Sequence, residues 1–202
     1  PRRFAGTDRQ VRGLLPDASF SIVALDRHPP KLVDYTSDAG SLGTALQQIG
    51  RRAPGVAAAY LNDSIGAAAR DLSRRRSLRP LILALTVGGE PLDERGTDVS
   101  AMADAALASL RRSGASLHVV MDKMREKGPV LADGPVQTGG TTEYIGDGGL
   151  WAILQTLRSQ YALTYTVPDG RKLDSGLVLR TSREGLRLIY PSVAGPNARP
   201  VE

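Results

Sequence analysis

The sequence predicts an α/β fold built around a doubly wound, mostly parallel sheet. Helix-like and strand-like segments alternate through about the first 120 residues. Two of the strand-like segments, 80–87 and 115–122, are apolar on both faces. Strands of this kind are typical of parallel sheets that are covered by helices on both sides. The length of 202 residues, with 41% hydrophobic and 23% charged residues, fits a soluble globular chain.

Local patterns place the elements in order along the chain. Helices are expected where apolar residues recur at helical spacing between a polar cap and a glycine or proline stop. Strands are expected in short apolar or alternating runs bounded by turn residues. The expected helices are 7–15, 38–50, 62–76, 97–114 and 149–160, and the expected strands are 18–26, 31–36, 80–87, 115–122 and 141–144. The pair 18–26 and 31–36 reads as a hairpin, and the Gly-rich region 125–149 reads as loop apart from the short strand.

The C-terminal part predicts an antiparallel strand extension of the sheet. Its three strand-like segments are 161–167, 173–181 and 186–190, with turns at "PDG" and "SREG". We therefore divide the chain into an α/β domain at 1–160, a β-strand extension at 161–192 and a flexible tail at 193–202. An edge strand offers unpaired backbone groups, so this extension is expected to carry a partner surface.

The apolar strands and the stripe of the last helix predict the core. The expected buried residues are Phe20, Ile22, Val23, Leu81, Ile82, Leu83, Leu85, Val119, Val120, Leu150, Ile153, Leu154, Leu157 and Tyr161.

Composition excludes several kinds of chemistry. The chain has no Cys, which rules out disulfides and thiol catalysis, and no apolar run long enough to span a bilayer. The net charge is +5, and "RDLSRRRSLR" at 70–79 is the densest basic cluster. This cluster is either a solvated helix face ending in cations or a patch for an anionic surface or nucleic acid. The two Phe and one Trp provide little stacking surface, so no nucleic-acid partner is expected.

Motifs for catalysis are weak. His28 lies in an expected turn and His118 in an expected strand, and neither has a second His or a carboxylate at ligand spacing. The sequence contains neither a Walker A pattern nor a G-x-G-x-x-G motif after a strand.

Carboxylates near strand ends are the better candidates for a site. Open α/β sheets bind ligands at the carboxyl ends of their strands, and oxygen-rich loops can hold Mg²⁺ or Ca²⁺. The candidate ligand or partner loop consists of Asp26, Gly88, Gly89, Glu90, Asp93 and Asp122.

From about residue 8 to 190 the chain resembles a von Willebrand factor type A (vWA) domain, a Rossmann-like fold, and in particular the bacterial vWA-related group. The most specific segment is "LRSQYALTYTVPDGRKLDSGLVLRTSREGLRLIYPS", which is similar to the closing segment of that group. "PGVAAAYLNDSIGAAARDL" resembles the family's Gly-Gly-Thr loop with its helix, and "RPLILALTVGGEP" resembles its fourth strand, which usually ends in Thr-Asp-Gly.

The resemblance implies a degenerate metal-ion-dependent adhesion site. The family takes its metal ligands from a D-x-S-x-S motif, a Thr and an Asp. The Thr position falls at Ala57 or Ala58 and the Asp position at Val87, and no D-x-S-x-S segment follows an expected strand, since the match "DASFS" at 17–21 runs into the expected strand 18–26. Because Ala and Val offer no oxygen to a hard cation, we expect neither metal nor cofactor.

These observations support two hypotheses about function. The first is a non-enzymatic protein-interaction domain of adhesion or scaffold type, in a bacterial extracytoplasmic setting, as the resemblance implies. The second is a small-ligand or enzymatic doubly wound domain whose site lies in the strand-end loops.

The resemblance also predicts a missing central strand. In the strand order 3-2-1-4-5-6 the first strand lies between the second and the fourth, which are assigned here to 18–26 and 80–87. No apolar strand precedes Ala18. We expect the gap to be filled by residues upstream of Pro1 or by another chain.

Overall fold

The fold is mixed α/β with two separate sheets. The computed structural model describes residues 13, 17–25, 30–51, 60–75, 77, 79–86, 99–122, 128–146, 148–161, 179–185 and 188–191, and every structural statement below concerns these residues. The first sheet is the expected hairpin, in which β1 (Phe20–Val23) pairs antiparallel with β2 (Lys31–Thr36). The second sheet is parallel and has the order β3-β4-β5.

The parallel sheet confirms the expected α/β class. Leu81 pairs with Ser116 and Leu85 with Val120, so β3 and β4 run side by side in register. The strand β5 pairs with the last half of β4. The bounds are β3 Leu81–Leu85, β4 Ser116–Met121 and β5 Thr142–Tyr144.

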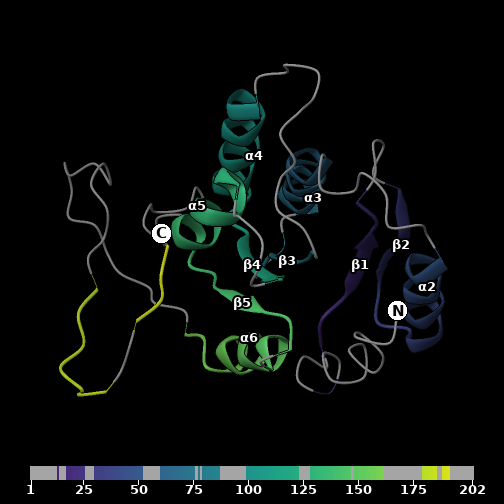
Figure 1. The fold of residues 1–202 in the computed structure, drawn as a ribbon. Coiled ribbons are helices and arrows are strands. Elements are labelled where there is room, and N and C mark those ends of the chain that lie inside the picture. The colour runs from purple at the N-terminus through teal and green to yellow at the C-terminus, as the bar shows by residue number, and fades with distance from the viewer. Residues whose placement is uncertain are drawn as a thin grey trace, which may run out of the picture.

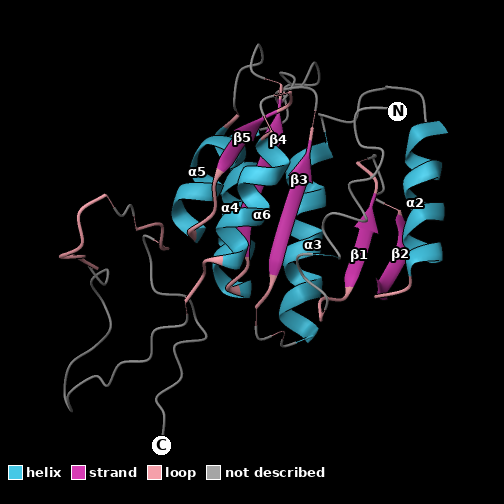
Figure 2. Ribbon diagram, turned by 90° about the horizontal axis from the view of Figure 1, so that it is seen from below, coloured by secondary structure: helices cyan, strands magenta, loops and turns pink. Residues whose placement is uncertain are grey.

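Helices cover both faces of the parallel sheet. Figure 1 shows α3, α4 and α5 on one face and α6 on the other, while α2 packs on the hairpin. The bounds are α2 Ala39–Arg51, α3 Leu61–Arg75, α4 Val99–Ser113, α5 Pro129–Thr138 and α6 Gly149–Arg158. Figure 2 shows the hairpin at the β3 side of this sheet, with β1 as its nearer strand.

Alternate residues of the strands build two cores. Leu117, Val119 and Met121 of β4 pack with α3, α4 and α5, whereas Val120 packs with α6. The same alternation divides β3, where Ala84 contributes to the first core and Leu83 packs against the second. Side chains that alternate between two covered faces explain why these strands are apolar throughout.

The helix α5 corrects the expectation of a loop at 125–149. Glycine was interpreted there as a sign of turns, but it serves close packing instead. A Cβ atom on Gly134 would lie 2.7 Å from Cδ2 of Leu117, and one on Gly140 would collide with the Leu117 carbonyl oxygen. The helix begins at Pro129, where the missing N–H costs nothing, and ends at Gly139 with a φ of 71°.

The predicted core is correct in its centre and wrong at one end. Val119, Val120, Ile153, Leu154 and Leu157 are buried. Tyr161 is 88% exposed, because α6 ends at Arg158 and the chain carries Tyr161 beyond the helix's apolar face. The other eight residues are partly buried: Phe20, Ile22, Val23, Leu81, Ile82, Leu83, Leu85 and Leu150.

The strands β1 and β3 belong to different sheets and do not pair with each other. Direct pairing would have contradicted the proposed strand order. Within the described residues, the outer edge of β3 has no strand partner, which fits the partial exposure of its leucines. The intervening strand itself stays a prediction.

The C-terminal extension is described only in part. Residues 179–181 and 188–190, which the sequence assigned to strands, have no strand structure. The turn at "SREG" is present, with Gly185 at a φ of 76°. The segments 161–167 and 173–178 lie largely outside the described residues.

Candidate functional site

The strand-end loop predicted from the sequence lies almost entirely outside the described residues. This holds for the candidate loop residues Asp26, Gly88, Gly89, Glu90 and Asp93, and for the degenerate metal positions Ala57, Ala58 and Val87. Only Asp122 of the candidate set is described.

Asp122 lies at the shared carboxyl edge of the parallel strands. The N–H of Thr86, just after β3, donates to the Val120 carbonyl at 3.0 Å, and the N–H of Ile145 donates to the Met121 carbonyl at 2.9 Å. These bonds extend the parallel pairing to the end of each strand. Asp122 is half-buried, and both Asp122 and Thr86 take part in further interactions. Among the described residues, no three His, Cys, Asp or Glu side chains group closely enough to hold a metal ion.

His118 is an interior residue of β4. Its side chain is fully buried, and burial lowers its pKa to about 4. Its Nδ1 atom lies 3.3 Å from the backbone N–H of Thr141, which donates to it, and 3.2 Å from the Thr141 hydroxyl. The residue is therefore neutral at pH 7 and closed to solvent, which suits a structural role better than proton transfer.

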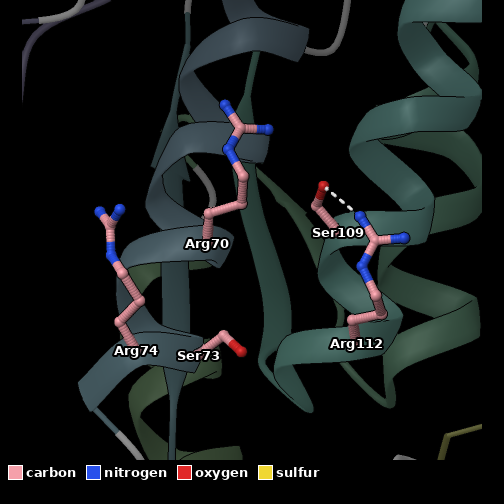
Figure 3. Close-up of a pocket in the computed structure, with 5 residues that line it drawn as sticks. All are labelled: Arg70, Ser73, Arg74, Ser109 and Arg112. Atoms are coloured by element: carbon pink, nitrogen blue, oxygen red, sulfur yellow. Dashed lines mark hydrogen bonds between the residues drawn. The ribbon is translucent and has the colours of Figure 1, made fainter.

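A basic groove runs between α3 and α4. Its volume is about 270 Å³, and Figure 3 shows the residues that line it, which are Arg70, Ser73, Arg74, Ser109 and Arg112. Small residues bring the two helices together, since a Cβ atom on Gly66 would lie only 3.7 Å from Cα of Ala106. The same atom would lie 3.2 Å from Nη1 of Arg70, so this guanidinium folds back over Gly66.

The two helices position the groove's cations differently. The Nη2 atom of Arg112 donates to the Ser109 hydroxyl at 3.2 Å, and that hydroxyl donates to the Ala105 carbonyl at 2.8 Å. Arg74 forms an ion pair with Asp71 at 3.2 Å. Within the described chain, no carboxylate pairs with Arg70 or Arg112, and none lines the groove.

A separate ion network joins β2 to α3. Lys31 Nζ lies 2.8 Å from Asp71 and 3.1 Å from Asp34, and Arg75 donates to both carboxyl oxygens of Asp34. The guanidinium of Arg75 also stacks 3.9 Å from the ring centre of Tyr35.

These contacts shift several pKa values. The hydrogen bond from Lys31 lowers the pKa of Asp71, and the same bond raises the pKa of Lys31. The network thus pairs Arg74 and Arg75 with carboxylates, and Arg74 also lines the groove beside Arg70. The run 70–79 alone could not make this distinction, because the partners are distant in sequence.

Large apolar side chains are exposed on several elements that follow β4. Five of the six that are described follow β4 in sequence, and only Ile49 lies elsewhere. In Figure 1, α5, β5 and α6 form the end of the sheet opposite the hairpin. The segment 188–191 joins them, since Tyr190 and Pro191 contact Gly139. We call these exposed side chains together the apolar end, although α5 and α6 cover opposite faces of the sheet; they are Val136, Trp151, Tyr161, Leu188 and Ile189.

Trp151 is the most distinctive residue of the apolar end. It is the only Trp of the chain and is 50% exposed on α6. The opposite face of the helix is held in the core by Ile153, Leu154 and Leu157. Sequence reasoning placed this helix correctly but did not single out Trp151, although a tryptophan outside the apolar stripe is a signal that it could have used.

Comparison with models of known protein families and with characterised proteins found no match for the chain. In the part of the chain that the structure describes, no helix combines the length and the apolar character needed to cross a membrane.

Proposed function

We propose that the chain is a non-enzymatic protein-interaction domain of vWA type that serves adhesion or scaffolding and does not depend on a metal. The observation that carries the proposal is the apolar end. A half-exposed Trp on a helix that is anchored in the core is the kind of rigid aromatic residue that dominates binding energy at protein interfaces. Other large apolar side chains are exposed on α5 and at positions 161, 188 and 189.

Two further features support the proposal. Helices on both faces of a parallel sheet agree with the resemblance to vWA domains. His118, the histidine that the structure describes, is buried in the interior and does not contact solvent. Following the same resemblance, we assign the domain to a bacterial extracytoplasmic setting, with another protein as its partner.

Site-specific photo-cross-linking tests this function. A photoreactive phenylalanine derivative replaces Trp151 in cells that naturally produce the protein, and a matched variant carries it at Gln47. Gln47 is exposed on α2, at the other end of the molecule. We expect a discrete protein adduct from position 151 and none from position 47, with the adduct identified by mass spectrometry.

The competing function is a small-ligand or enzymatic domain with its site in the strand-end loops. Equal cross-linking from both positions, or none from position 151, together with tight divalent-cation binding by calorimetry, would favour that alternative over a protein partner.

A further inference from the structure

The groove between α3 and α4 presents cationic and hydroxyl side chains from two helices. Two guanidinium groups without a described carboxylate partner, Arg70 and Arg112, reach it from different helices. Guanidinium groups bind carboxylates and phosphates through paired N–H donors. Figure 3 shows both side chains rising along their helices with Ser109 between them, and the Ser73 hydroxyl directed from α3 toward α4.

One of the two guanidinium groups is held by a hydrogen bond within its own helix. The hydrogen bond to Ser109 fixes the guanidinium of Arg112, and Ser109 is itself buried. Arg70 lies against Gly66, where any side chain larger than hydrogen would crowd it. Side chains that are held in place before binding lose less conformational entropy when a ligand arrives.

The described side chains that line the groove carry positive charge and no negative charge. Arg74 shares the Asp71 carboxylate with Lys31, and within the described residues no carboxylate pairs with Arg70 or Arg112. A phosphorylated side chain carries about −1.5 to −2 charges at pH 7 and three acceptor oxygens. A volume of about 270 Å³ admits such a group but is smaller than most pockets that enclose a whole small molecule.

The same features favour a protein over a nucleic acid as the source of the anion. None of the lining residues is aromatic, so bases would find no surface on which to stack. Tyr35, on the neighbouring β2, is already covered by Arg75. A nucleic acid also needs a track of cations along its backbone, whereas the groove is lined by three arginines, Arg70, Arg74 and Arg112.

We propose that the groove formed by Arg70, Ser73, Ser109 and Arg112 binds a phosphorylated side chain of the partner protein. This inference rests on the proposed function, because it specifies the chemistry of the partner. The phosphoryl group lies between the two guanidinium groups and receives hydrogen bonds from both. The contact adds selectivity to an interface whose apolar part lies elsewhere on the domain.

Fluorescence anisotropy with short labelled peptides tests the groove directly. The probe is a Gly/Ser-rich peptide with one phosphoserine, compared with the unphosphorylated peptide, with a glutamate version and with a single-stranded oligonucleotide of the same charge. We expect only the phosphopeptide to bind well, with affinity that falls as salt rises. The double variant Arg70→Gln/Arg112→Gln should bind at least roughly tenfold more weakly, since charge-assisted hydrogen bonds are lost.

The matched control is Arg111→Gln, which removes one charge from the same turn of α4 outside the groove. We expect this variant to bind as the parent does, and urea unfolding should show that all variants stay folded. The proposal is overturned by equal loss in Arg111→Gln, by unchanged binding in the double variant, by equal binding of the glutamate peptide, or by tighter binding of the oligonucleotide. This assay uses a defined peptide and does not involve Trp151. A negative result would therefore reject the phosphate site in the groove without affecting the cross-linking test of the proposed function.

Discussion

The Oγ1 atom of Thr138, the last residue of α5, accepts a 2.9 Å hydrogen bond from the backbone N–H of Leu117 at the start of β4. The Thr138 hydroxyl in turn donates to the Gly134 carbonyl at 2.7 Å. Both residues are buried. One hydroxyl thus joins the helix that the sequence did not predict to the central strand of the parallel sheet.

Thr138→Val should destabilise the fold by about 1–3 kcal/mol. The change keeps the shape of the side chain but leaves the buried N–H of Leu117 without an acceptor. Urea unfolding followed by circular dichroism measures the loss. Thr156→Val is the matched control, because the Thr156 hydroxyl only donates back to the Ala152 carbonyl within α6. If both variants lost the same free energy of unfolding, the hydrogen bond between the Leu117 N–H and Thr138 would contribute no more than a hydrogen bond within a helix.

Gly134→Ala and Gly43→Ala should act in opposite directions, although both glycines lie in helices. The new Cβ at position 134 would meet Leu117 Cδ2 at 2.7 Å, and overpacking typically costs about 1–3 kcal/mol. At position 43, on α2, nothing lies within 4 Å, so the helix gains about 0.5–1 kcal/mol. Thermal unfolding of the pair checks this, and stabilisation at both positions would show that α5 does not pack closely on β4.

His118 should make the fold less stable as the pH falls from about 6.5 toward 4. Burial lowers the His118 pKa to about 4, so the unfolded chain binds the proton first in this window. The stability is present above the unfolded pKa and declines with pH, by a total on the order of 3 kcal/mol. Subtracting the pH profile of His118→Asn isolates this contribution from the carboxylates. An NMR titration that placed the His118 pKa near 6.5 would refute the buried geometry.

The ion network between β2 and α3 should contribute little, and in a salt-dependent way. Asp71→Asn removes the partner of Lys31 and should cost no more than about 1 kcal/mol at neutral pH and low salt. The pKa of Asp71 is lowered in the folded state by the hydrogen bond from Lys31, so its contribution exists above the unfolded pKa of about 3.9. This contribution to stability is lost as the pH falls through the lower pKa that Asp71 has in the folded state. The check is urea unfolding at two salt concentrations, with the exposed Asp104→Asn on α4 as the control; a salt-independent loss would argue against the ion pairs.

The sequence predicted those parts of the fold in which local pattern and tertiary role agree. The run Leu81–Leu85 and the stripe Ile153–Leu157 have one physical interpretation each, and the structure has the same elements there. The parallel pairing followed from strands that are apolar on both faces.

The helix α5 could not be predicted in this way. Gly134 and Pro135 are unfavourable in an isolated helix. Their value appears only when the helix lies against Leu117, a contact between residues that are far apart in the chain. Similarly, nothing in the run 70–79 distinguishes Arg75, which pairs with Asp34, from Arg70, which faces the groove. For the predicted strand-end site, only Asp122 lies within the described residues, so that prediction stays open.

The fluorescence of Trp151 during titration with the partner identified by cross-linking, with and without Mg²⁺, Mn²⁺ or Ca²⁺, shows whether binding at the apolar end depends on a metal. Trp151 is the only Trp of the chain, so the tryptophan fluorescence comes from the apolar end. This holds when the partner has no tryptophan; otherwise the partner carries a quenching label and the quenching of Trp151 is measured. We expect a saturable change with the same affinity in chelator and in each divalent ion, and weaker binding in Trp151→Phe. Binding that required a divalent ion would contradict the claim, because it would show a functional metal-dependent adhesion site.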